Sequence, residues 1–256
     1  MIKAIVTDLD GTLLRTDKTI SDYTTGVLRK CREAGVKTVF ATARSQQSAK
    51  LFLQRFQPDA FIGHGGALTL IGNETAGRIA ISSETCAHLI RRCLETPEVT
   101  AIYAIHETAA LTSRRDVESD PEYSHYRHAD LLSLTGESYL KISIQCLSPE
   151  TARQIAEEFP ECRMQSYSGE DLYSFASVEA TKWNALRALV AHEDISTEEI
   201  AAFGDDWNDL EMLQNCGAGV AVENAIPEVK AAARFHTASN DKDGVAKWLE
   251  ANLLTK

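Results

Sequence analysis

The sequence contains no long apolar run, and this absence excludes a chain that crosses a membrane. A membrane helix needs about 20 consecutive apolar residues, and polar or charged residues interrupt every apolar stretch here before that length. The opening stretch carries a single Lys and an apolar run that stops at Asp8, which is not the pattern of a secretory signal. We therefore expect a soluble, cytoplasmic protein with no membrane partner.

Cysteine, proline and glycine are also scarce. The 6 Cys show no CxxC pair and no clustering with His, whereas a disulfide framework or a zinc site would need close spacing. We expect most of these Cys to be small buried apolar residues in a reducing compartment. With only 6 Pro and 14 Gly against 44% hydrophobic residues, extended disorder is excluded as well.

Basic residues are in deficit, since 26 Lys and Arg stand against 37 Asp and Glu for a net charge of −11. Such a charge repels phosphate backbones and acidic headgroups, so we expect no nucleic-acid partner. A small phosphorylated ligand is still compatible with it, because a divalent cation and a few local Lys or Arg can reverse the sign within one cleft. The sequence does not indicate an oligomeric state.

Both ends of the chain alternate between short apolar strands and helices, while 256 residues are enough for two domains. Ser21 and Ser45 are candidate N-caps for the first two helices. We expect strands over Ala4–Thr7, Val36–Ala41, Ala60–Gly63, Ile200–Phe203 and Val220–Val222, and helices after Ser21, over Ser45–Phe56, over Thr181–Ala191, after Asp209 and over Gly244–Leu253. Near-continuous apolar strands in this order predict a parallel sheet covered on both faces.

The middle of the chain has a different pattern, with consecutive strands between helices. We expect helices over Ser83–Leu94 and from Pro149, and strands over Val99–Ile105, Ala109–Ser113, Leu140–Leu147, Cys162–Tyr167 and Leu172–Ala176. Residues 114–139 show little periodicity and should form a loop or an irregular lid. The prediction is an α/β core domain, 1–81 and 179–256, interrupted by an inserted α+β domain over 82–178.

Two acidic clusters follow predicted strands. Asp8 and Asp10 come directly after the first strand, and Asp205, Asp206 and Asp209 follow a later one. A lone Asp at such a position usually caps a turn, but ligand sites of open parallel sheets lie at the carboxyl ends of the strands. Two carboxylate clusters at one edge would repel each other unless a cation lay between them, and an open oxygen-rich site suits Mg²⁺.

These residues resemble the motifs of the haloacid dehalogenase-like hydrolase superfamily. Asp8-Leu9-Asp10-Gly11-Thr12 is similar to its DxDGT signature, and Gly204-Asp205-Asp206-Trp207-Asn208-Asp209 to its GDxxND motif. Thr42 and Lys182 match the second and third motifs, in the right order. Because the insertion lies between these two, the chain resembles the Cof-type subfamily with a C2 cap. The resemblance implies a Rossmann-like parallel-sheet core with an inserted α+β cap domain.

The resemblance also implies a Mg²⁺-dependent phosphatase that works through an aspartyl phosphate. Asp8 would be the nucleophile, and Asp10 would protonate the leaving group and then activate water. Mg²⁺ would be held by Asp8, Asp205 and the main-chain carbonyl of Asp10. The substrate would be a small phosphorylated metabolite, with a sugar phosphate as the leading class.

The remaining motif positions would bind or support the phosphoryl group. Thr42, Arg44, Lys182 and Asn208 are implied substrate-binding residues, and Asp209 would act indirectly, by holding groups that touch metal or substrate. The chain departs from the usual subfamily pattern at three positions. Ala43 stands where Gly is usual, Trp183 follows the lysine where Gly is frequent, and Gly65 replaces an Asn.

Some residues of the insertion could read the rest of the substrate. Tyr123, His125, Tyr126, Arg127 and His128 offer suitable side chains, although a solvated loop is the simpler interpretation, and Arg114 with Arg115 is equally well a surface charge pair. We expect Trp183, Trp207 and Trp248 to be packing residues, with Trp207 also placed to line the cleft because it lies within the acidic motif.

Three other functions compete with phosphate-ester hydrolysis. A hexose-phosphate mutase shares this cap type. A phospho-accepting signalling domain also combines an acidic pair, a Thr and a Lys, but it needs its acceptor Asp after the third strand, where this chain has Ile62-Gly63-His64. A catalytically silent relative is disfavoured because every chemical position is filled. The cap loops, which choose the substrate, do not reveal it from sequence.

Overall fold

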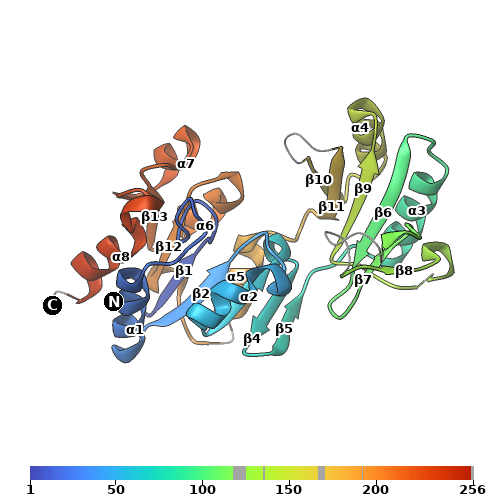
Figure 1. Cartoon of the computed structure of the whole chain (residues 1–256). Helices are drawn as coiled ribbons and strands as arrows, with labels where there is room; N and C mark the ends of the chain where they lie inside the picture. The colour runs from blue at the N-terminus through green and yellow to red at the C-terminus, as the bar shows by residue number, and fades with distance from the viewer. Residues whose placement is uncertain (118–124, 135, 167–170, 192, 255–256) are drawn as a thin grey trace. The chain divides into compact units, whose positions relative to one another are not determined.

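The computed structural model describes residues 1–117, 125–134, 136–166, 171–191 and 193–254 (Figure 1). The chain forms two compact units. The first comprises Met1–Gly77 and Thr181–Lys256, and the second comprises Arg78–Ala180. The sequence boundaries at 82 and 178 fall just inside this second unit.

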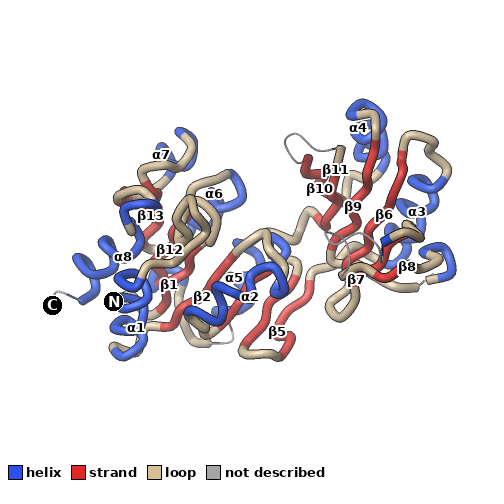
Figure 2. The backbone as a smooth tube through the Cα atoms, viewed as in Figure 1, coloured by secondary structure: helices blue, strands red, loops and turns tan. Residues whose placement is uncertain are grey.

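The first unit contains an eight-stranded sheet with the order β14-β13-β12-β1-β2-β3-β4-β5 (Figure 2). All its neighbouring pairs from β14 to β3 are parallel, and β4 turns back antiparallel to β3. The strands are β1 Ala4–Thr7, β2 Lys37–Ala41, β3 Ala60–Gly63, β4 Leu68–Ile71, β5 Glu74–Arg78, β12 Ile200–Gly204, β13 Ala218–Val222 and β14 Phe235–Thr237. The predicted α/β core with a mainly parallel sheet is confirmed.

The helices of this unit begin where the sequence provides caps. Ser21 and Ser45 accept hydrogen bonds from the backbone N–H groups of Thr24 and Ser48, as N-cap residues do. The helices are α1 Asp22–Glu33, α2 Gln46–Arg55, α5 Lys182–Ala191, α6 Leu210–Asn215, α7 Pro227–Ala232 and α8 Gly244–Leu249. Helix α1 packs against α8, and α5 against α6.

The centre of the sheet determines where the acidic clusters lie. β1 and β12 are parallel neighbours in a register that places Thr7 beside Phe203. The residues that follow these strands therefore emerge at the same edge of the sheet. The backbone N–H of Asp8 still donates to the carbonyl of Phe203 at 3.0 Å, so Asp8 leaves the sheet in a fixed direction.

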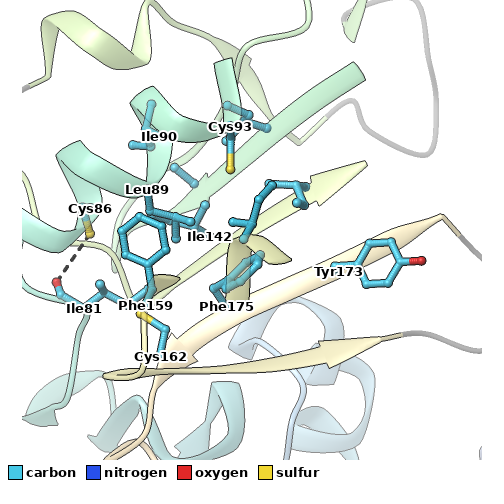
Figure 3. Close-up of a cluster of buried hydrophobic side chains, with 14 of the residues drawn as sticks. Ile81, Cys86, Leu89, Ile90, Cys93, Ile142, Phe159, Cys162, Tyr173 and Phe175 are labelled. Atoms are coloured by element: carbon cyan, nitrogen blue, oxygen red, sulfur yellow. Dashed lines mark hydrogen bonds between the residues drawn. The ribbon is translucent and has the colours of Figure 1, made fainter. Parts of the chain in front are cut away.

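The second unit contains a six-stranded sheet with the order β10-β11-β9-β6-β7-β8, in which only β7 and β8 pair in parallel. Its strands are β6 Val99–Ile105, β7 Ala110–Thr112, β8 Arg127–His128, β9 Lys141–Cys146, β10 Cys162–Ser166 and β11 Leu172–Ser177, and its helices are α3 Ser83–Leu94 and α4 Pro149–Glu158. Alternate residues of the strands, such as Ile142 and Phe175, pack with Leu89 of α3 in one apolar core (Figure 3). The predicted α+β arrangement is present.

All six cysteines are buried and free, which confirms their prediction as apolar packing residues. Cys86, Cys93, Cys146 and Cys162 belong to the core of the second unit. Burial raises the pKa of the Cys93 and Cys162 thiols to about 12, so these thiols are not reactive at neutral pH.

Several expectations need correction. The strands β4, β5 and β14 and helix α7 were not predicted, and the segment expected to be irregular contains β8 and a short 3-10 helix, Leu131–Ser133. Trp248 packs against Phe203 as expected, but Trp207 is 59% exposed, so its prediction as a packing residue is wrong. Among the described helices, none has the length and apolar character needed to span a membrane.

Candidate active site

The loop after β1 closes onto the second acidic cluster. Thr12 Oγ1 donates to Asp205 Oδ1 at 2.6 Å. Gly11 has a φ of 78°, and a Cβ built at this position would lie 2.4 Å from Asp205 Oδ2. A side chain at residue 11 would therefore push Asp205 away, and only glycine allows the two strand ends to meet so closely.

Lys182 connects the two acidic clusters through hydrogen bonds to one carboxylate of each. Its side chain is fully buried, and its Nζ donates to Asp8 Oδ1 at 2.6 Å and to Asp209 Oδ1 at 2.7 Å. Lys182 begins helix α5, and the preceding Thr181 packs against the turn at Gly66, where a Cβ would lie 2.2 Å from the Thr181 carbonyl oxygen. Backbone contact at Gly66 thus sets the position from which the lysine reaches the carboxylates.

Asp209 is fully buried and uses both of its oxygens. Besides its bond to Lys182, its Oδ2 accepts from the backbone N–H groups of Asp205 and Asp206 at 3.1 and 3.2 Å. A single carboxylate therefore fixes both the lysine and the backbone that carries Asp205. The indirect role that the resemblance implies for Asp209 stays a prediction.

The electrostatics of the cluster favour a bound cation. Burial raises the pKa of Asp8 to about 8 against the opposing effect of Lys182, and nearby Asp209 and Asp205 add to the rise. Burial likewise raises the pKa of Asp205 to about 6, with Thr12 opposing it. Asp8, Asp205 and Asp209 each offer an oxygen within 4.8 Å of the others. The raised pKa values mean that these carboxyl groups are costly to ionise together, and a hard cation such as Mg²⁺ would favour their ionised forms.

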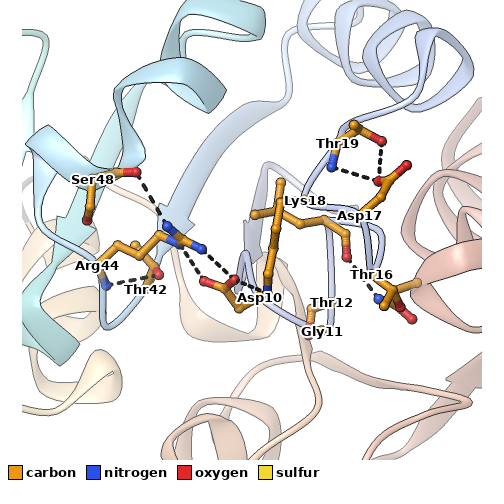
Figure 4. A network of polar contacts seen from close by, with 12 residues as sticks. Asp10, Gly11, Thr12, Thr16, Asp17, Lys18, Thr19, Thr42, Arg44 and Ser48 are labelled. Carbon is orange, nitrogen blue, oxygen red and sulfur yellow. Dashed lines mark hydrogen bonds and ion pairs between the residues drawn. The ribbon is translucent and has the colours of Figure 1, made fainter. Parts of the chain in front are cut away.

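Asp10 lies in a separate basic environment (Figure 4). Arg44 donates to it twice, from Nε to Oδ2 at 2.5 Å and from Nη2 to Oδ1 at 2.8 Å, and Lys18 Nζ donates to Oδ1 at 2.8 Å. Partial burial of Asp10 acts to raise its pKa, but the hydrogen bonds from Arg44 and Lys18 together lower it to about 2. Asp10 is therefore a carboxylate throughout the physiological range.

Thr42 and Asn208, the remaining motif residues, differ in their burial. Thr42 is buried just beyond the end of β2, where its amide donates to the Ile62 carbonyl and its Oγ1 accepts from the Arg44 amide at 3.2 Å. Asn208 is exposed in the short 3-10 helix Trp207–Asp209. The structure thus brings Asp8, Lys182, Asp205 and Asp209 into one chain of contacts, pairs Arg44 with Asp10, and leaves Asn208 on the surface.

Sequence reasoning missed several residues that shape this site. Lys18 gave no signal, because a lysine in a polar loop is normally solvated. Gly11 and Thr12 were recognised as part of a motif without their contacts to Asp205, and Gly66 without its contact to Thr181. The run His64-Gly65-Gly66 carried a usable signal, since adjacent glycines indicate a backbone that needs left-handed conformations, and all three residues have positive φ.

The candidate residues of the insertion are mostly engaged within their own unit. Arg114 makes a two-point ion pair with Asp116, with both contacts at 3.0 Å. The ring of Tyr126 packs on Tyr103 with their centroids 5.0 Å apart. His128 is exposed, with its Nδ1 3.0 Å from the Arg114 carbonyl, while Arg115, His125 and Arg127 are also exposed. Tyr123 lies outside the described residues.

Comparison with known protein families identifies the family of this chain. The profile of the haloacid dehalogenase-like hydrolases matches residues 5–249. The chain is 26% identical over 271 residues to the 5-amino-6-(5-phospho-D-ribitylamino)uracil phosphatase YitU of Bacillus subtilis, covering 96% of each protein. It is 26% identical over 238 residues to the HMP-PP phosphatase of an Enterobacter species, covering 90% of this chain and 87% of that one.

A solved structure shares the fold over the whole length. The HAD subclass IIB sugar phosphatase BT4131 superposes with a TM-score of 0.79 at 23% identity, covering 97% of this chain and 98% of that one. At this identity the likeness establishes the fold alone.

Proposed function

Because this chain belongs to the haloacid dehalogenase-like hydrolases and is a phosphatase of that family, we propose that it hydrolyses the monoester of a small phosphorylated metabolite with the help of Mg²⁺. A sugar phosphate is the leading substrate class, by analogy with the sugar phosphatase that has the same fold. The observation that carries the proposal is the buried contact of Lys182 with both Asp8 and Asp209, beside Asp205. A carboxylate nucleophile, a fixed cation and a site for a second cation lie together there.

The donor set fits Mg²⁺, which prefers a few carboxylate and carbonyl oxygens and keeps open positions for water and phosphate. Asp8 and Asp205 would hold the ion together with the main-chain carbonyl of Asp10. Asp209 would not, because its two oxygens already accept three hydrogen bonds. When bound, the ion would reduce the repulsion between an anionic nucleophile and an anionic phosphate.

In the first step, an Asp8 oxygen attacks phosphorus in line with the ester oxygen. The bond from phosphorus to the ester oxygen breaks, and its electron pair goes to the leaving oxygen, which takes a proton from Asp10 and departs as the alcohol. Arg44 and Lys18 hold Asp10 as a carboxylate in the substrate-free site, so Asp10 would take up this proton as the substrate binds, when the negative charge of the ester beside it raises its pKa. The monoanionic form of the ester, whose phosphate has a second pKa of about 6, would bring the proton in. Lys182, Thr42 and the amide of Asn208 would stabilise the equatorial oxygens.

In the second step, Asp10 takes a proton from a water molecule as the water oxygen attacks the phosphorus of the aspartyl phosphate. The bond from phosphorus to Asp8 breaks, and its electron pair restores the Asp8 carboxylate as inorganic phosphate leaves. Asp10 is already in the deprotonated form that this step requires.

We also propose that residues 82–178 are a C2-type cap that determines specificity. The phosphoryl group and the metal would occupy Asp8, Asp10, Thr42, Lys182 and Asp205, so other residues must read the rest of the metabolite. Substitution of the exposed Arg127 and His128 should then reorder preference within a panel of metabolites and leave hydrolysis of p-nitrophenyl phosphate nearly unchanged. An equal loss with both kinds of substrate would contradict the specificity role. The free, buried cysteines fit a reducing cytoplasm as the working compartment.

The central experiment is phosphate release from a panel of phosphorylated metabolites with and without Mg²⁺. We expect at least one sugar phosphate among the best substrates and loss of turnover after chelation. Full activity after exhaustive chelation would end the metal proposal, and no release from any ester by folded protein would end the phosphatase proposal for this site.

A further inference from the structure

The guanidinium of Arg44 is hydrogen-bonded to the carboxylate of Asp10. Its Nε and Nη2 donate to the two oxygens of the carboxylate, and its Nη1 donates to the Ser48 carbonyl at 3.4 Å (Figure 4). Each of its three nitrogens therefore already has an acceptor within the first unit. This differs from the sequence interpretation, in which Arg44 is a direct ligand of the substrate.

The arginine is itself held in place from several sides. Its backbone N–H donates to Thr42 Oγ1, and its carbonyl accepts from the His64 N–H at 2.9 Å. Its guanidinium carbon lies 5.1 Å from the centre of the Phe52 ring, within the range of a cation–π contact. The Arg44 side chain is 27% exposed and has a defined direction, unlike a typical surface arginine.

Lys18, which follows Asp10 in the loop after β1, is the second cation that contacts this carboxylate. It lies in a tight turn in which its N–H donates to the Arg15 carbonyl and the Arg15 N–H donates to the Thr19 carbonyl. Its side chain is 56% exposed, so water competes for its contact with Asp10. Arg44 is therefore the stronger of the two partners, and Asp10 Oδ2, which receives one donor against two for Oδ1, keeps more of its capacity to accept.

We propose that Arg44 is a positioning residue for Asp10: its planar fork sets the plane of the Asp10 carboxylate and directs Oδ2 toward the proton that is exchanged, with Lys18 as a weaker support. The inference rests on the proposed function, because it gives Asp10 the task of exchanging protons with the leaving group and with water. A misplacement of about 1 Å can cost about 100-fold in rate. A lysine at position 44 would keep the charge and lose the two-point geometry.

The test compares two esters of similar size. The leaving group of p-nitrophenyl phosphate departs without a proton, whereas that of benzyl phosphate is a poor alkoxide that needs one. For both Arg44→Lys and Arg44→Gln we expect kcat/KM to fall by about 30-fold or more with benzyl phosphate and by less than about threefold with p-nitrophenyl phosphate. Arg55→Gln is the matched control, since Arg55 ends helix α2, which begins just after Arg44, and makes an exposed ion pair with Asp22.

A direct ligand of the substrate would behave differently. In an Asp8→Asn background, which cannot be phosphorylated, we expect Arg44→Gln to leave the Kd for benzyl phosphate within about threefold. A tenfold weaker Kd, or equal losses of kcat/KM for the two esters, would overturn the positioning role. Phe52→Leu keeps both members of the ion pair and removes the aromatic face, so it should show the same selective loss to a smaller degree, even if Arg44→Gln folds poorly.

The proposed function and this inference can fail separately. If folded wild-type protein releases phosphate neither from these two esters nor from any metabolite of the panel, the proposed function fails, and thermal unfolding tests whether Arg44 and Asp10 are coupled. In that case Asp10→Asn, Arg44→Gln and the double variant form a cycle. The double variant should lower Tm by no more than the more damaging single change. Losses of Tm that add would overturn the coupling of Arg44 to Asp10.

Discussion

Replacement of Asp209 by Asn tests whether one buried carboxylate organises the site. An amide has one acceptor oxygen and one donor NH₂ group. In either orientation, the NH₂ group faces a donor, either the Lys182 ammonium at 2.7 Å or the backbone N–H groups of Asp205 and Asp206. Breaking a buried ion pair by removing one partner costs about 3–5 kcal/mol. At about 2–4 °C per kcal/mol for a unit of this size, Tm should fall by about 6–20 °C.

The assay is calorimetric unfolding of metal-free protein at neutral pH, with Asp206→Asn as the control on the same loop. Asp206 is exposed, and its side chain caps the short 3-10 helix by accepting from the backbone N–H of Trp207 at 2.8 Å and from that of Asp209, a task that Asn performs nearly as well. The control should therefore stay close to wild type. If Asp209→Asn lowers Tm no more than Asp206→Asn does, the buried pair is not what holds the site together, and the reasoning is refuted.

Three further outcomes are expected. Asp8→Asn should abolish turnover while the protein stays folded, and retention of even a tenth of wild-type activity would count against Asp8 as the nucleophile. The apparent affinity for Mg²⁺ should rise from pH 6 to pH 8, because the raised pKa values of Asp8 and Asp205 mean that protons compete with the metal at the lower pH; calorimetric titrations with equal affinity at both pH values would disprove this. Gly66→Ala should lower both Tm and turnover, because its Cβ would meet the Thr181 carbonyl oxygen at 2.2 Å, whereas Gly72→Ala meets no atom and should cost only the strain of its left-handed backbone, about 1–2 kcal/mol.

Much of the fold was predictable because local patterns and tertiary structure agree in it. The strands β1, β2 and β3 are short apolar runs, and Ser21 and Ser45 both cap helices as predicted. The hairpin of β4 and β5 was missed although Gly72-Asn73 is a turn signal, because most residues of β5 are exposed and show no apolar alternation.

The site was predictable in its members and not in its contacts. Motif order identified Asp8, Lys182 and Asp205, but no spacing reveals that a lysine pairs with a carboxylate 27 positions later as well as with one 174 positions earlier. The pairing of Arg44 with Asp10 depends on how two loops meet at the sheet edge. Residue type alone also predicted the burial of Trp207 wrongly, because tryptophan is usually buried, whereas this one is exposed in a surface loop.

The strand order of the first unit has a consequence for how the protein is made. β1 lies between β2 and β12, and β12 is synthesised only after all of residues 78–180. The second unit draws every strand from one continuous stretch, so its sheet is complete when that stretch has left the ribosome. Until β12 has been made, the apolar strand β1 has one edge without a partner, and unpaired edges of this kind are prone to aggregation. When residues 78–180 have left the ribosome, the nascent chain therefore carries a complete second sheet, while the first sheet still lacks β12, β13 and β14.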